Sequence, residues 1–252
     1  MRGAGMGRRL VVCCDGTWNR WEGRNDTNVE IACRTVVEDG FCGQLVRYFE
    51  GVGASGCWLQ RFAEGAFGWG LNRNILIAYR WLATTYRSGD AIYVFGFSRG
   101  AYTARSLIGL IRNAGLLKPE TLARADEAMA LYRDRARGPD HPDAQLFRRR
   151  YAVAEEPPEI AYLGVWDTVG ALGVPATFPG SRLINRRHRF HDTELSRIVR
   201  RARHAVAVDE PRVAFEATLF DLSKKKPDQV IEQAWFPGVH GSVGGGGPDR
   251  GL

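Results

Sequence analysis

The sequence predicts an α/β fold with a mostly parallel sheet that carries helices on both faces. Short apolar segments rich in β-branched and aromatic residues recur along the chain, and segments with helical spacing separate them. One apolar segment, Ala91 to Phe95, ends in a glycine-rich turn and is followed by apolar residues at helical spacing from Ala101 onward. Strands of a parallel sheet are buried on both faces, so they have this continuous apolar character. Regular alternation of strands and helices is typical of a parallel sheet covered by helices.

Length and composition fit one globular domain spanning residues 1–252. The 252 residues are 44% hydrophobic and 25% charged, as in ordinary globular domains. The five cysteines form no Cys-x-x-Cys pair, so we expect reduced thiols, no metal site and no cofactor. The sequence shows neither a secretory signal nor a stretch of about 18 apolar residues, which predicts a cytoplasmic chain unless a dedicated secretion system exports it.

The net charge of +7 comes mostly from clusters of arginine at 148–150, 186–187 and 200–201. Such clusters usually lie on solvated helix faces. The alternative is attraction to an anionic surface, either a membrane or a nucleic acid. Because no nucleic-acid-binding motif accompanies the charge, we expect peripheral contact with an anionic membrane rather than with nucleic acid.

The amino-terminal part of the chain alternates strands with helices. Apolar runs predict strands over Leu10–Cys14, Gln44–Phe49 and Ala91–Phe95, and helical spacing predicts helices over Val29–Val37, over Asn74–Tyr86 and from Ala101 onward. The segment Cys57 to Leu71 mixes aromatic side chains with glycines, which suits either a lipid-facing lid or ordinary helix packing.

The carboxy-terminal part continues the alternation after a helical insertion of about residues 118–156. The insertion contains a charged helix over Glu120–Arg135. Beyond it we expect a strand over Ile160–Val165, a basic helix over Leu195–Val206 and a last strand over Val230–Trp235.

Ser98 is the candidate nucleophile. It lies in Gly96-Phe97-Ser98-Arg99-Gly100, which fits the G-x-S-x-G elbow that lifts a serine Oγ out of the backbone between a strand and a helix. Gly96 and Gly100 leave room for the sharp turn. The alternative is an ordinary serine in a turn. A nucleophile at Ser98 requires a carboxylate and then a histidine at the ends of later strands.

Asp167 and His240 meet this requirement. Asp167 follows the strand that begins at Ile160, although an aspartate there also suits a helix cap or an Asx-turn. His240 follows the last strand on a glycine-rich loop and is the preferred general base. His204 is alternatively an ordinary cap or core histidine, and Asp209 is a candidate salt-bridge partner.

Backbone N–H groups beside Ser98 are candidates for an oxyanion hole. Arg99 N–H follows the nucleophile directly, and Gly16 or Thr17, at the end of the first strand, could supply the second donor. Asp15 would then support this loop. The alternative is a simple turn closed by the Asp15 side chain.

These motifs together resemble a known family, the α/β-hydrolase domain that includes class-one type VI secretion lipase effectors and was long catalogued as a domain of unknown function. The resemblance covers nearly the whole chain. It rests on six blocks in the sequence: VVCCDGTWN at 11–19, TNV at 27–29, GFSRGAYTAR at 96–105, VWDTVG at 165–170, HAVAVDE at 204–210 and WFPGVH at 235–240.

The resemblance implies a serine esterase or lipase with a Ser98-Asp167-His240 triad and a lipid or ester substrate, since the characterised effectors are phospholipases. A secretion-system partner agrees with it, although no secretion module is fused within these residues. This chain departs from the family in two ways. Ser242 stands where the family usually has an aspartate, and the chain ends at Leu252, where the family continues into a further helix, so we expect a truncated C terminus.

Two hypotheses follow. The first is a serine hydrolase acting through an acyl-enzyme. The second is a binding module that keeps the hydrolase scaffold, because Ser242 and the end at Leu252 could leave the His240 loop unsupported.

The first hypothesis also predicts a geometry. Four parallel strands, at Val11, Ile92, Ile160 and Ile231, should lie side by side and bring the three side chains to one edge. Ser98 Oγ should lie within about 3–4.5 Å of His240 Nε2, with Asp167 at Nδ1 of the same ring.

Overall fold

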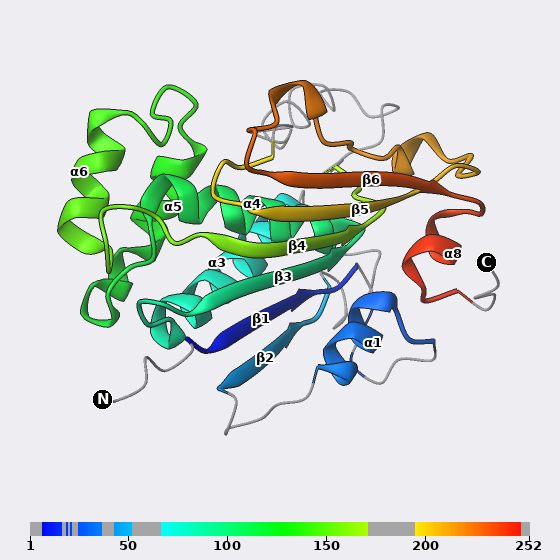
Figure 1. The fold of residues 1–252 in the computed structure, drawn as a ribbon, viewed down its shortest axis with the longest axis horizontal. Coiled ribbons are helices and arrows are strands. Elements are labelled where there is room, and N and C mark those ends of the chain that lie inside the picture. Colours follow the sequence, from blue (N-terminus) through cyan, green and yellow to red (C-terminus); the bar gives the residue numbers. More distant parts are fainter. Residues whose placement is uncertain are drawn as a thin grey trace.

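A computed structural model describes residues 7–16, 19, 21, 25–36, 43–51, 67–170 and 195–247. Within these residues six parallel strands form one sheet, in the order β2-β1-β3-β4-β5-β6 (Figure 1). The strands are β1 Arg9–Cys14, β2 Gln44–Phe49, β3 Ala91–Phe97, β4 Ile160–Trp166, β5 Arg201–Ala207 and β6 Val230–Phe236. The carboxyl ends of all six therefore lie at one edge, which is where open α/β sheets place their chemistry.

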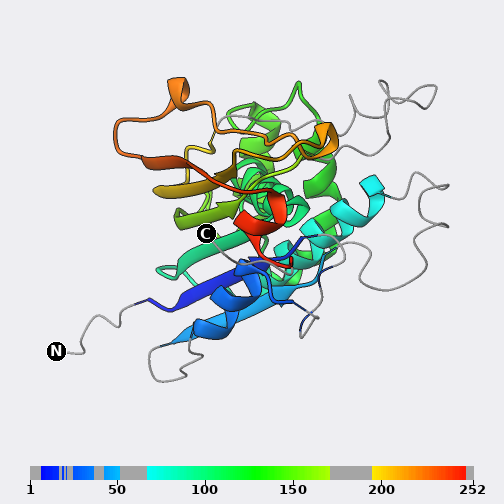
Figure 2. The ribbon, with the colours of Figure 1, turned by 90° about the vertical axis from the view of Figure 1, so that its right-hand side faces the viewer.

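Helices flank the sheet on both faces, which confirms the predicted fold class. Figures 1 and 2 show α1 against one face, near β1, while α3 and α4 lie against the other. The α-helices in the described residues are α1 Asn28–Thr35, α3 Phe67–Thr85, α4 Arg99–Ala114, α5 Ala125–Arg133, α6 Pro142–Tyr151 and α8 His240–Gly244. Short 3-10 helices are η1 Pro119–Arg124, η2 Val213–Phe215 and η3 Leu222–Lys224.

Two apolar clusters hold the layers together. The larger one lies between the sheet and α3, α4 and α5, and includes fully buried Leu10, Ile92 and Leu107. The smaller cluster lies under α1 on the opposite face of the sheet, where Val29 meets Val11. Alternate residues of β1 and β3 point to opposite faces, so both strands contribute to both clusters.

The predicted basic helix over Leu195–Val206 is wrong, because β5 runs from Arg201 to Ala207. Arg201 and Arg203 are exposed while Ala202 and His204 are buried. This two-residue alternation is the period of a strand, and the arginine-rich composition obscured it. The new strand pairs with both β4 and β6. It therefore separates the strands at Ile160 and Ile231, which were expected to be neighbours.

The insertion between α4 and β4 contains η1, α5 and α6 and packs on α4 (Figure 1). Our sequence analysis missed α6. Arg148, expected on a solvated face, is instead buried on α6 and donates to the backbone carbonyls of Asn113, Pro139 and Glu155. Most of the segment expected to form either a lid or a packed helix, residues 57–66, lies outside the described residues, and α3 begins at Phe67. Across the described part of the chain, no helix combines the length and apolar character needed to cross a membrane.

Candidate active site

Ser98 sits at the junction of β3 and α4 in an unusual backbone conformation. Its φ of 56° and ψ of −123° are rare for a residue with a side chain. Backbone hydrogen bonds hold it there: Ser98 N donates to Trp166 O at 3.0 Å, and Tyr102 N donates to Ser98 O at 3.2 Å. Strain of this kind, of order 1–3 kcal/mol, persists where surrounding contacts enforce it and is concentrated at functional sites.

The glycines on either side of Ser98 are required by close backbone approach. A Cβ on Gly100 would lie 2.2 Å from Cys14 O, and a Cβ on Gly96 would lie 2.7 Å from Gly100 O. The end of β1 is thereby pressed against the start of α4. Gly16 is also beside the nucleophile, since a Cβ there would lie 3.3 Å from Ser98 Cβ.

The structure brings Ser98, His240 and Asp167 into one hydrogen-bonded chain. His240 Nε2 lies 2.8 Å from Ser98 Oγ, and His240 Nδ1 lies 2.5 Å from Asp167 Oδ2. All three residues are buried, with exposed fractions of 5%, 6% and 1% in the order named. The serine–imidazole distance is shorter than the loosened geometry predicted from the sequence and is that of a formed hydrogen bond.

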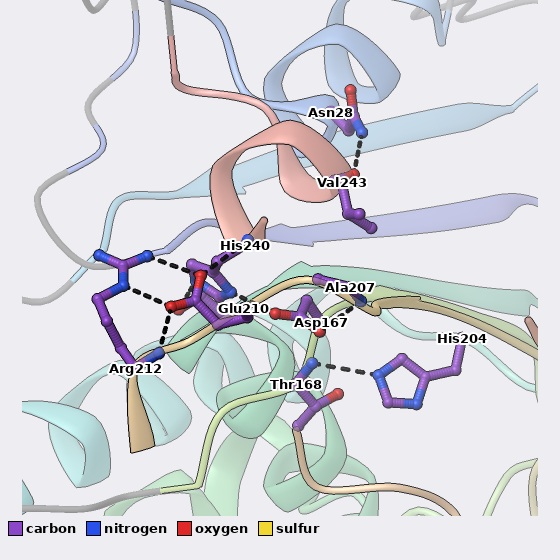
Figure 3. Close-up of polar contacts among 10 residues, drawn as sticks. Asn28, Asp167, Thr168, His204, Ala207, Glu210, Arg212, His240 and Val243 are labelled. Atoms are coloured by element: carbon purple, nitrogen blue, oxygen red, sulfur yellow. Dashed lines mark hydrogen bonds and ion pairs between the residues drawn. The ribbon is translucent and has the colours of Figure 1, made fainter. Parts of the chain in front are cut away.

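Asp167 is aimed by the backbone at the end of β4. Its φ of 38° places it in the left-handed region, where few residues other than glycine occur. Asp167 N donates to Ala205 O at 2.7 Å, and Asp167 Oδ1 accepts from Ala207 N at 3.0 Å. One carboxylate oxygen is thus held by β5 while the other meets the imidazole (Figure 3).

The imidazole of His240 is held between aromatic rings. The Phe97 ring centroid lies 4.6 Å from that of His240, and the Phe215 ring makes an edge contact at 4.8 Å. His240 is the first residue of the five-residue helix α8. Asn28 Nδ2 donates to Val243 O at 2.8 Å, so α1 anchors α8 (Figure 3).

His204 has a role that the sequence did not indicate. Its Nε2 accepts from Thr168 N at 3.1 Å, and its Nδ1 lies 3.0 Å from Gln233 Oε1. Burial is the main cause that lowers its pKa from 6.5 to about 4. The ring is therefore neutral at pH 7, with Nδ1–H donating to Gln233 and Nε2 accepting from the backbone next to Asp167.

The Asp15 carboxylate is the centre of the turn after β1. It accepts from Thr27 Oγ1 at 2.6 Å, Tyr48 OH at 2.5 Å and Gly16 N at 2.6 Å. Burial raises its pKa, and these donors oppose the shift. The Gly16 N–H donates to this carboxylate, as in the alternative of a turn closed by Asp15, and the part of Gly16 in an oxyanion hole stays a prediction.

The other predicted oxyanion donors are the backbone N–H groups of Arg99 and Thr17. Arg99 is the first residue of α4, so its N–H lies at a helix N terminus next to Ser98. Burial lowers the pKa of the Arg99 guanidinium to about 10, which leaves it charged at neutral pH. Thr17 lies outside the described residues.

Two supporting residues escaped the sequence analysis. Glu210 Oε2 accepts from His240 N at 3.0 Å, and Ala207 N donates to Asp167 as described above. Both belong to the HAVAVDE block at 204–210, which carried the family resemblance without a role for each residue. The block was the sequence signal that pointed to these residues. Their contacts could be identified only from the folded structure. Asp209, expected in a salt bridge, accepts from Gly238 N at 2.6 Å.

Comparisons with known proteins identify the family of this chain. Residues 8–252 match the family model described as the type VI secretion system phospholipase effector Tle1-like catalytic domain. The solved structure of the Tle1 effector bound to the VgrG spike is similar to this chain at 18% identity and a TM-score of 0.53, covering 97% of this chain and 53% of that one. An uncharacterized protein from Pseudomonas aeruginosa is similar at 18% identity and a TM-score of 0.52, covering 94% and 41%.

A relative in Saccharomyces cerevisiae, the uncharacterized protein YEL023C, is 28% identical over 236 residues, which is 85% of this chain and 33% of that protein. The chain thus spans between a third and about half of the length of these relatives. The family model covers all six strands, the turn that carries Ser98 and the loops that carry Asp167 and His240. The chain belongs to the Tle1-like phospholipase effector family of the type VI secretion system, whose catalytic domain it matches.

Proposed function

We propose that this domain is a serine hydrolase that cleaves the carboxylic ester bonds of phospholipids. The observation that carries the proposal is the continuous chain from Ser98 Oγ through the His240 ring to Asp167, at 2.8 Å and 2.5 Å. Family membership and the hydrolase fold support an ester-hydrolysing, lipase-like activity. A contact with an anionic membrane and a secretion-system partner are proposals for this chain; the VgrG complex is a property of the Tle1 relative.

The proposed reaction has two halves. His240 Nε2 takes the proton from Ser98 Oγ as the oxygen attacks the ester carbonyl carbon, and Asp167 stabilises the imidazolium that forms. The tetrahedral intermediate collapses when Nε2 returns this proton to the leaving alcohol oxygen, giving an acyl-enzyme. Nε2 then deprotonates a water molecule, which attacks the acyl carbon, and Ser98 leaves with the proton as the carboxylic acid is released.

The developing oxyanion needs hydrogen-bond donors. The Arg99 N–H at the start of α4 is the donor that the described residues offer beside Ser98. Partial positive charge at a helix N terminus adds to this stabilisation. Thr17 N–H stays the predicted second donor.

Substitution of the nucleophile tests the proposal. Ser98→Ala should lower kcat/KM for p-nitrophenyl esters and phospholipids by at least about 10³-fold, because removing one triad member disables the unit. Ser223→Ala removes a hydroxyl that donates to Asp221 on exposed η3 and serves as the control with parental activity. Hydrolysis by Ser98→Ala at the parental rate would refute the nucleophile assignment.

A fluorophosphonate probe separates this function from the alternative of a non-catalytic binding module. Labelling of the parent at Ser98, lost in Ser98→Ala, supports the hydrolase. Folded parent protein that resists the probe would favour the binding module.

A further inference from the structure

Strand β5 and the turn that follows it contact both the acid and the base of the proposed triad. Their backbone and side chains make three hydrogen bonds to the loops after β4 and β6 (Figure 3). They are Thr168 N to His204 Nε2 at 3.1 Å, Ala207 N to Asp167 Oδ1 at 3.0 Å and His240 N to Glu210 Oε2 at 3.0 Å. The acceptor of the last bond is the side chain of Glu210, which no step of the proposed reaction uses.

Glu210 is an ionised carboxylate in a half-buried residue. Its side chain is 5% exposed. Arg212 donates to it through Nη2 at 2.8 Å and through its backbone N at 3.1 Å, and Nε of Arg212 completes a two-pronged ion pair. The hydrogen bond from Arg212 is the largest cause that lowers the pKa of Glu210 to about 2. The carboxylate therefore carries a full negative charge at the pH where a serine hydrolase works.

The same ion pair also contacts the His240 imidazole indirectly, through the ring of Phe215. The Arg212 guanidinium carbon lies 3.9 Å from the centroid of the Phe215 ring. The Phe215 ring in turn meets His240 edge to face at 4.8 Å. The ion pair with Glu210 holds Arg212 over this ring, so one carboxylate supports both the backbone and the ring face of His240.

We propose that Glu210 is the positioning residue of the general base: it fixes the backbone N–H of His240 and, through Arg212 and Phe215, the plane of its ring. The inference rests on the proposed function.

Geometry explains why such support is needed. His240 begins a helix of five residues that follows Pro237 and Gly238, and a helix this short is not stable by itself. Without an acceptor for its N–H, the start of α8 would be free to shift, and the imidazole would move with it. A misplacement of about 1 Å at a reacting group can cost roughly 10²-fold in rate.

The test compares Glu210→Ala, Glu210→Gln and the control Glu159→Ala. Glu159 also pairs with two nitrogens of an arginine, Arg200, but this pair is exposed and lies at the amino end of the sheet. We expect Glu210→Ala to lower kcat for p-nitrophenyl butyrate by about 10- to 100-fold with little change in KM, because positioning acts on the reaction step. Glu210→Gln keeps one acceptor oxygen and should recover part of kcat, while Glu159→Ala keeps parental values.

Amide hydrogen exchange of the peptide around His240 gives a readout that needs no activity. Exchange there should be faster in Glu210→Ala than in the parent and in Glu159→Ala, with circular dichroism showing a folded chain in each. Unchanged exchange, or faster exchange with parental kcat, would overturn the inference. If the parent neither cleaves esters nor reacts with a fluorophosphonate, the proposed function fails, and the exchange data alone decide whether Glu210 holds the loop.

Discussion

At the scale of single residues, the site depends on side chains that are held in different charge states. His204 is neutral because burial lowers its pKa to about 4, whereas Arg212 keeps Glu210 ionised. A neutral His204 can accept from Thr168 N, while a protonated ring could not. The charge state of a residue outside the triad therefore supports the backbone that carries Asp167.

The lowered pKa of His204 predicts how the free energy of unfolding depends on pH. The unfolded chain protonates this residue below about pH 6.5, and the folded chain only below about pH 4. Between these values the unfolded state binds more protons, so acidification should lower the free energy of unfolding, by about 3 kcal/mol over the window. Urea unfolding at a series of pH values measures this decline.

Variants isolate the contribution of His204 from that of other groups. His204→Gln removes the titrating ring, so its decline between pH 6.5 and 4 should be smaller than the parent's, although it starts from a lower stability at pH 7. His141→Gln, at a more exposed position that caps α6, should retain the full decline. Equal declines in the parent and in His204→Gln would contradict the assignment.

At the scale of elements, α8 is held by its neighbours as well as by its own hydrogen bonds. Asn28 Nδ2 donates to Val243 O, and Thr27 forms an isolated bridge with Gly245. We expect Asn28→Ala to destabilise the chain by about 1 kcal/mol, the worth of a typical hydrogen bond. It should also speed amide exchange in α8 and lower the rate of ester hydrolysis, because His240 begins this helix.

Asn74 provides the matched control for α8. Its Nδ2 donates to Glu50 O at 2.9 Å, again from a helix to a backbone carbonyl, but α3 lies on the face of the sheet opposite to α1. Asn74→Ala should leave exchange in α8 and the rate of hydrolysis unchanged. If both variants changed exchange in α8 equally, the anchoring of α8 by α1 would be wrong.

At the scale of the whole molecule, the net charge of +7 favours association with anionic surfaces. We expect the Ser98→Ala protein to sediment with vesicles that contain phosphatidylglycerol at about 0.01 M salt, where the Debye length is about 30 Å. Binding should be lost towards 1 M salt, where that length is about 3 Å. Vesicles of phosphatidylcholine alone are the control, and equal binding to both vesicles would show that charge is not the cause.

Local sequence patterns determined the main part of this fold. The apolar run at 91–95, the glycine-rich turn and the helical spacing after it predicted β3, the elbow and α4, because all of these signals come from neighbours in the chain. The positions of Asp167 and His240 after parallel strands predicted that both would converge with Ser98 at one edge of the sheet, and the structure has His240 Nε2 at Ser98 Oγ and Asp167 Oδ2 at His240 Nδ1. Because the carboxyl ends of parallel strands share one edge of the sheet, this convergence could be predicted from the sequence alone.

Only the tertiary structure decided the place of β5 in the sheet and the contacts that support the three site residues. Residues 201–207 became a strand because β4 and β6 offer hydrogen bonds on both sides, and pairing of this kind overrides a weak local pattern. The Gly16 N–H, a candidate from its position, is taken by Asp15 once Thr27 and Tyr48 enclose that carboxylate. Glu210 and His204 act on residues about 30 and 36 positions away in the chain, and no local period encodes such contacts. They exist because β5 lies between β4 and β6, an order that follows from packing the whole sheet.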